Sequence, residues 1–130
     1  MKTRNILASA CMMLAMGVAT EVSAATKIMY TTPIYENMTS DSFSRISCSA
    51  LNLDKKVQNV RAEVIAGDGV TILNDKTEAL NPGEVKRIAY MSLGTPDSVY
   101  CKFTINSTKV RPYVNVYDKD WHLVFVMDAK

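Results

Sequence analysis

The chain has 130 residues, a formal net charge of +2 at neutral pH and 48% hydrophobic residues. This composition is typical of a folded chain rather than a disordered one, and the length suits one small domain. The near-neutral charge excludes the strongly basic surface of a nucleic-acid-binding protein, and it gives no electrostatic reason to bind a membrane surface.

Residues 1–24 have the pattern of a secretory signal peptide. Lys2 and Arg4 form a short positive segment, residues 6–18 are mostly apolar, and residues 22–24 are small enough for a signal peptidase site. An apolar run of about thirteen residues is too short to cross the roughly 30 Å of a bilayer core. The alternative is a lipoprotein signal at Cys11, but the apolar run continues beyond that residue.

Cleavage after Ala24 or Ala25 would leave residues 25–130 as a single domain. We therefore expect a secreted or periplasmic protein that does not insert into a membrane after its signal is removed.

Within the domain of residues 25–130, residues 25–35 alternate in part, and Pro33 predicts a strand at a sheet edge because proline cannot donate a ladder hydrogen bond. Residues 37–42 are polar and indicate a loop.

The next part of the chain alternates more clearly. In the strand expected at residues 44–53, Ile46 and Cys48 share one face. Residues 57–66 have a clean period of two, which is typical of a half-buried antiparallel strand. The Gly-Asp-Gly sequence at residues 67–69 then predicts a turn.

Shorter and less regular elements follow. We expect a short strand at residues 70–73, whereas residues 74–80 are polar and ambiguous. The Asn-Pro-Gly sequence at residues 81–83 predicts a type II turn, with proline and glycine at its two central positions. The remaining expected strands are residues 84–91, 99–106, 110–117 and 121–127, with a loop at 92–98 and a hairpin turn at 118–120. About eight short strands with turn residues between them predict an all-β fold, an antiparallel β-sandwich of seven or eight strands.

Cys48 and Cys101 are the two cysteines that remain after signal cleavage. An even number of cysteines in a small exported domain predicts a disulfide, because the compartment is oxidising. Closing a loop of about 54 residues would remove unfolded-state entropy worth roughly 4 kcal/mol. A redox or metal-binding pair is the alternative, although the sequence has no Cys-x-x-Cys motif. Both cysteines lie on the apolar faces of their strands, so the bridge would join two opposing sheets.

A bridge from the second to the sixth expected strand resembles the arrangement of immunoglobulin-like domains. The chain is similar in architecture to a secreted bacterial immunoglobulin-like β-sandwich, and this resemblance covers most of residues 25–130. Two features of the family are absent from their usual positions: residues 57–66 contain no tryptophan, and Val99 stands where the family has its corner tyrosine.

Few residues point to catalysis or metal binding. His122 is the only histidine, so a Ser-His-Asp or Cys-His mechanism would have to use it. We interpret it as an outward strand residue beside a turn, and we expect no catalytic residues and no enzyme activity. A copper site formed by His122 with Met127 or Met29 is the alternative, but packing of the methionines is the favoured interpretation, so we expect no metal and no cofactor.

One strand favours a binding function. In residues 110–117 three valines share one parity, and the other parity carries Arg111, Tyr113, Asn115 and Tyr117. Tyrosine and arginine are enriched at interface hot spots, so this row predicts a surface that binds a partner. The alternative is the ordinary preference of tyrosine for strands.

Together these patterns predict an exported, non-catalytic binding or structural domain whose partner is a protein or a surface ligand. The alternative function is a small periplasmic metal-binding or redox accessory protein.

Overall fold

The computed structural model describes residues 25–35, 45–92 and 98–130. These residues form antiparallel strands and no helix, which confirms the all-β prediction. The strands are β1 (Lys27–Tyr30), β2 (Ile34–Tyr35), β3 (Arg45–Asn52), β4 (Gln58–Ala66), β5 (Ile72–Leu80), β6 (Val85–Ser92), β7 (Ser98–Ile105), β8 (Val110–Tyr117) and β9 (Leu123–Asp128). The signal peptide expected at 1–24, the loop at 37–42 and most of the loop at 92–98 lie outside the described residues.

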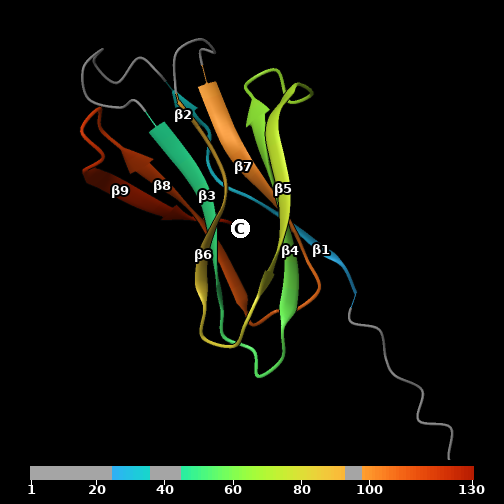
Figure 1. Cartoon of the computed structure of the whole chain (residues 1–130). Helices are drawn as coiled ribbons and strands as arrows, with labels where there is room; N and C mark the ends of the chain where they lie inside the picture. The colour runs from blue at the N-terminus through green and yellow to red at the C-terminus, as the bar shows by residue number, and fades with distance from the viewer. Residues whose placement is uncertain (1–24, 36–44, 93–97) are drawn as a thin grey trace, which may run out of the picture.

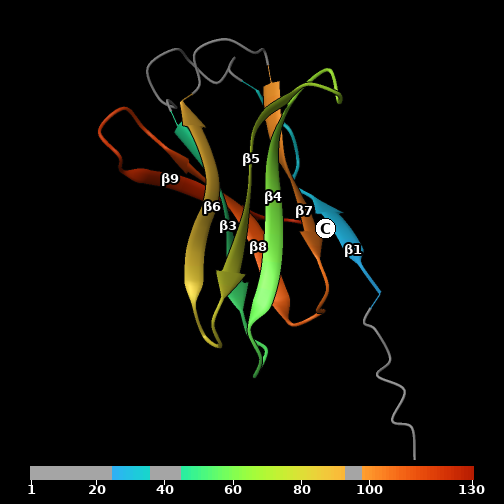
Figure 2. The same ribbon diagram turned by 45° about the vertical axis from the view of Figure 1, so that its right-hand side comes forward.

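The strands form two sheets that lie face to face (Figure 1). Sheet A has the order β1-β7-β4-β5, and β2 also pairs with β7. Sheet B has the order β6-β3-β8-β9. At one side of the sandwich β5 and β6 lie next to each other (Figure 2), where the Asn74 amide donates to the Tyr90 carbonyl oxygen at 2.6 Å. The predicted β-sandwich is confirmed.

The core lies between the sheets and is built by the apolar parity of each strand. In β7, for example, Cys101, Phe103 and Ile105 are buried, and the residues between them are half-buried. Cys48 of β3 and Cys101 of β7 are bonded, with their Cα atoms 5.7 Å apart and both side chains fully buried. The predicted disulfide is therefore confirmed, and it joins interior strands of opposing sheets. Its burial disfavours the redox alternative, because thiol exchange needs access for an attacking thiolate.

The expected short strand at residues 70–73 is wrong. Residues 72–80 instead form one continuous strand of nine residues, β5, which pairs with β4 along its whole length. The structural reason is the position of β5 at the edge of sheet A, where most of its side chains contact water. A polar sequence can form a strand there because its pairing with β4 does not require an apolar face.

The first expected strand is divided in two. Pro33 separates β1 from β2, and both segments pair with β7 at the edge of sheet A, as the proline indicated. The Asn-Pro-Gly turn also has its expected geometry. Gly83 has φ of 75°, and the Glu84 amide donates to the Asn81 carbonyl oxygen at 3.0 Å. This positive φ explains why glycine occupies the second central position of the turn.

The strands beside the two cysteine strands have a distinctive order. β1 lies beside β7, β8 lies beside β3, and the last strand, β9, belongs to sheet B together with β3. In immunoglobulin constant domains, by contrast, the last strand belongs to the sheet that carries the second cysteine. The family resemblance therefore stays a prediction about the general architecture.

Among the described residues, no helix is long and apolar enough to span a bilayer.

Candidate functional site

The outer face of sheet B carries the predicted binding row. Arg111 is exposed, the other three members are half-buried, and the intervening valines of β8 lie in the core. The row therefore points outward, as the parity of the sequence indicated. The neighbour of this row on β9 is the exposed Val126, which is paired with Asn115. At the other end of the row, a register shift between Val116 and Tyr117 pairs Tyr117 with Leu123 of β9.

Two small serines lie beneath the centre of this face. Ser47 and Ser49 have outward parity on β3 but are almost fully buried, because β3 lies between β6 and β8, whose longer side chains cover them. Their hydroxyl oxygens are 3.2 Å apart, and the Asn115 amide donates to Ser49 at 3.3 Å. Partial burial raises the pKa of the Tyr113 phenol, and the nearby Tyr117 acts in the same direction. Tyr113 therefore stays neutral at physiological pH.

Five side chains form an arginine–aromatic cluster at one end of the face, Arg45, Arg87, Tyr90, Tyr117 and Trp121. The guanidinium carbon of Arg45 lies 4.3 Å from the centre of the Trp121 ring, and that of Arg87 lies 5.4 Å from the same ring. Arg87 also lies 5.9 Å from the Tyr90 ring, and the Tyr117 and Trp121 rings are 5.7 Å apart. Such distances are those of cation–π and aromatic pairs.

The turn between β8 and β9 holds Trp121 in place. The Asp118 carboxylate accepts hydrogen bonds from the backbone amides of Asp120 and His122, each at 2.8 Å, and lies 3.0 Å from the His122 ring nitrogen Nδ1. Trp121 has φ of 68°, an uncommon value for a residue other than glycine. The His122 amide lowers the pKa of the Asp118 carboxyl, and the His122 ring and the Asp120 amide act in the same direction.

This turn also bears on the metal-binding alternative. Ligand atoms of Asp118, Asp120 and His122 lie within 4.8 Å of one another. However, the turn hydrogen bonds of Asp118 account for this arrangement without an ion. Met29 and Met127, the other residues of the copper alternative, pack against the core, whereas the His122 side chain is 78% exposed. The copper site suggested by the sequence therefore has no geometric support.

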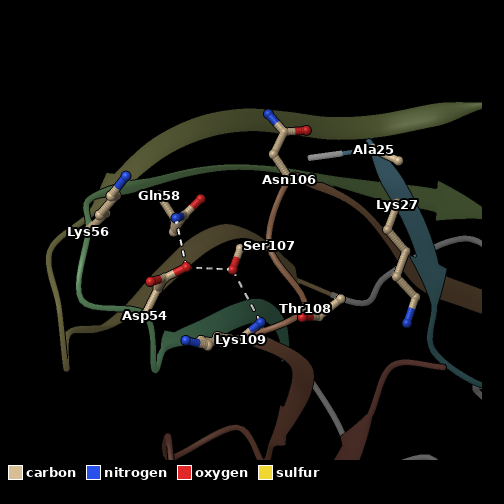
Figure 3. Close-up of a pocket in the computed structure, with 9 residues that line it drawn as sticks. All are labelled: Ala25, Lys27, Asp54, Lys56, Gln58, Asn106, Ser107, Thr108 and Lys109. Carbon is tan, nitrogen blue, oxygen red and sulfur yellow. Dashed lines mark hydrogen bonds between the residues drawn. The ribbon is translucent and has the colours of Figure 1, made fainter. Parts of the chain in front are cut away.

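A polar hollow of about 550 Å³ lies near the start of β1, by the turns after β3 and β7 (Figure 3). Three lysines contribute to its lining, Lys27, Lys56 and Lys109. Asp54 is its one acidic lining residue, and it accepts hydrogen bonds from Ser107 at 2.7 Å and from Gln58 at 3.1 Å. The Ser107 hydrogen bond lowers the pKa of Asp54. The lysine ammonium groups point in different directions in Figure 3, so the hollow does not focus them on one ligand atom.

The sequence did not predict the arginine–aromatic cluster. Arg45, Arg87 and Trp121 come from β3, β6 and a turn, and only the register of sheet B brings them together. The one available signal was the single tryptophan of the chain beside a turn.

Comparisons with models of protein families, with curated proteins and with solved structures find no match. What this face can do follows from its side chains, because a β-sandwich supports many functions.

Proposed function

We propose that this protein is an exported, non-catalytic binding domain that holds a protein partner on the outer face of sheet B. The observation that supports this most directly is the arginine–aromatic cluster, which lies at the end of the predicted row. Tyrosine, tryptophan and arginine are the residues most enriched at energetic hot spots of protein interfaces. Here they come from three strands and a turn, and together they form one surface.

The strand next to the row adds apolar surface. Leu123, Val124 and Val126 of β9 are each about half exposed, at 55%, 45% and 49%. Exposed apolar side chains beside aromatic and arginine residues are typical of the central part of a protein interface. Exposed apolar side chains that gather beside polar residues mark interaction sites, and these three therefore support a protein ligand.

The non-catalytic part of the proposal rests on the positions of the polar residues. His122 lies in an exposed turn, where its ring contacts Asp118. The polar hollow does not include His122, and its carboxylate, Asp54, accepts hydrogen bonds from neighbouring side chains. Both described cysteines are in the disulfide. Among the described residues, these positions favour binding over group-transfer chemistry.

Site-specific photo-crosslinking tests the binding face. A photoreactive amino acid in place of Tyr113 should form a discrete crosslinked product in cells that produce the protein. The matched control replaces Thr104, which has outward parity on β7 of sheet A. We expect a product from position 113 and none of the same mass from position 104. Equal crosslinking from both positions would contradict the proposal.

The crosslinked partner, once identified, allows a quantitative test. Tyr113→Ala and Tyr117→Ala should each weaken its binding by more than about 1 kcal/mol without changing the fold. Unchanged affinity in both variants would remove the row from the interface.

Export is tested separately by mass spectrometry of the secreted or periplasmic protein. We expect its first residue to be Ala25 or Thr26, whereas an intact Met1 in that fraction would contradict cleavage.

A further inference from the structure

We propose that Arg45 and Arg87 form a binding site for carboxylates, which is occupied by an acidic segment of the partner protein. This inference rests on the proposed function and adds the chemical class of the ligand. It starts from the positions of the two guanidinium groups in the arginine–aromatic cluster. Both groups lie against the same indole ring, that of Trp121.

Contacts with aromatic rings orient the two guanidinium groups. One guanidinium nitrogen of Arg45 donates to the carbonyl oxygen of Lys119 at 2.6 Å, and the same group lies over Trp121. Arg87 lies within 6 Å of the centres of both the Trp121 and the Tyr90 rings, at 5.4 and 5.9 Å. A guanidinium that stacks on a ring keeps N–H groups in its own plane available for other acceptors. The remaining N–H groups can therefore form paired hydrogen bonds to a carboxylate, the geometry that arginine favours.

Arg45 and Arg87 do not take part in the ion pairs formed among the described residues. In the part of the chain that the structure describes, ion pairs involve Arg61, Lys76, Lys86, Lys102 and His122. Within that part, neither Arg45 nor Arg87 has a carboxylate within 4.0 Å. The nearby Asp118 carboxylate already accepts the hydrogen bonds of its turn. Two positive groups beside one ring repel each other, and a bound carboxylate would relieve that repulsion.

The aromatic and apolar surroundings of the two arginines favour a polypeptide over a glycan. Stacking of a sugar ring on Trp121 is disfavoured, because this ring already contacts Arg45 and Tyr117. The half-exposed apolar side chains of Val124 and Val126 lie on β9, the strand of the same sheet that pairs with β8. They fit the apolar side chains of a peptide better than the hydroxyl groups of a sugar. A segment that alternates acidic and apolar residues satisfies both parts of this surface.

The chain contains a built-in reporter for this proposal. Trp121 is its only tryptophan, so tryptophan fluorescence reports on the arginine–aromatic cluster alone. The purified protein, with its disulfide intact, is titrated with a peptide of alternating glutamate and valine. The matched probe has glutamine in place of glutamate, and a heparin fragment is the third probe. We expect a saturable change in fluorescence with the acidic peptide and at least about tenfold weaker binding of the glutamine peptide.

Variants then locate the binding. Arg45→Gln and Arg87→Gln should each weaken binding of the acidic peptide by about tenfold or more. Arg61→Gln is the matched control, because it removes the same charge from the outer face of sheet A, and it should leave peptide affinity unchanged. Thermal melting of each variant shows whether the fold is retained. Arg87→Lys keeps the charge but loses the planar group, and it should recover only part of the affinity.

Three results would overturn the proposal. The first is equal affinity for the glutamate and glutamine peptides. The second is an equal loss of affinity in Arg61→Gln, which would indicate a nonspecific effect of net charge. The third is binding of heparin without binding of the acidic peptide, which would assign the site to a glycan. If position 113 crosslinks a partner whose binding does not depend on Arg45 or Arg87, the carboxylate site is wrong while the proposed binding face stands.

Discussion

The outer faces of the two sheets treat their charged residues in opposite ways. On sheet A, the nearly buried Glu63 carboxylate lies 3.3 Å from Arg61 and 2.8 Å from Lys102, and Arg61 also lies 3.1 Å from Asp75. On sheet B, by contrast, Arg45 and Arg87 lie against aromatic rings. The charges of Glu63, Arg61, Asp75 and Lys102 on sheet A are paired within the chain, whereas Arg45 and Arg87 on sheet B have no carboxylate within 4.0 Å among the described residues.

This difference shows that the number of charges on a face says little about its role. Exposed ion pairs contribute little to stability, but they do reduce the charge available to other molecules. Arginines that stack on rings keep their charge and their donors. A binding face is therefore better identified by how its arginines are paired than by how many it has.

The disulfide should have the largest effect, because it joins β3 to β7 and thus supports both faces. Replacing Cys48 and Cys101 by alanine should lower the free energy of unfolding by about 2–5 kcal/mol. Chemical denaturation of the variant and of the wild type measures the difference. The reduced wild-type protein is the control and should resemble the variant. Unchanged stability in both would mean that packing alone holds the sheets together.

Glu63→Gln should have the next largest effect and concerns sheet A alone. The Glu63 side chain is only 4% exposed and contacts two cations, so the substitution removes a buried charge that Arg61 and Lys102 share. We expect a loss of about 1–3 kcal/mol in the free energy of unfolding. Asp75→Asn is the matched control, because Asp75 is 51% exposed and should change stability by less than about 1 kcal/mol. Equal effects would show that burial of the carboxylate does not matter.

Arg87→Gln should change stability by no more than about 1 kcal/mol, because it breaks exposed cation–π contacts but no ion pair among the described residues. It should nevertheless alter the fluorescence of Trp121, since Arg87 contacts that ring. Thermal melting and an emission spectrum of the same sample measure the two effects. A loss of stability as large as that of Glu63→Gln would assign Arg87 a structural role and would weaken the contrast between the faces.

The smallest effect concerns pH and the turn that holds Trp121. The folded protein lowers the pKa of Asp118 below its ordinary value of 3.8. The carboxylate therefore stabilises the fold above that value, and this contribution is lost as the pH falls through the lower pKa of the folded state. Acid titration of the wild type and of Asp118→Asn should show a difference in stability that decreases below about pH 4. A difference that does not change with pH would contradict the role of the charged form.

The elements that sequence could predict are those whose pattern is local. The alternation of Val99, Cys101 and Phe103 identified a strand and its buried face, and the same logic oriented the row on β8. Strand β5 was missed because an edge strand beside water needs no apolar alternation. The arginine–aromatic cluster was missed because Arg45, Arg87 and Trp121 are brought together by strand register, and a one-residue change of register would turn either arginine inward.

The strand order has a consequence for the time that the chain needs to fold. Ala62 pairs with Phe103, and Arg45 pairs with Tyr117, so the central contacts of both sheets join residues that are far apart in the sequence. Among the described strands, only β4–β5 and β8–β9 pair neighbours along the chain. Domains with mostly non-local pairing fold in about milliseconds to seconds. Strand β3 cannot pair with β8 before nearly the whole chain is available, so an early bond between Cys48 and Cys101 would shorten the search by bringing β3 and β7 together.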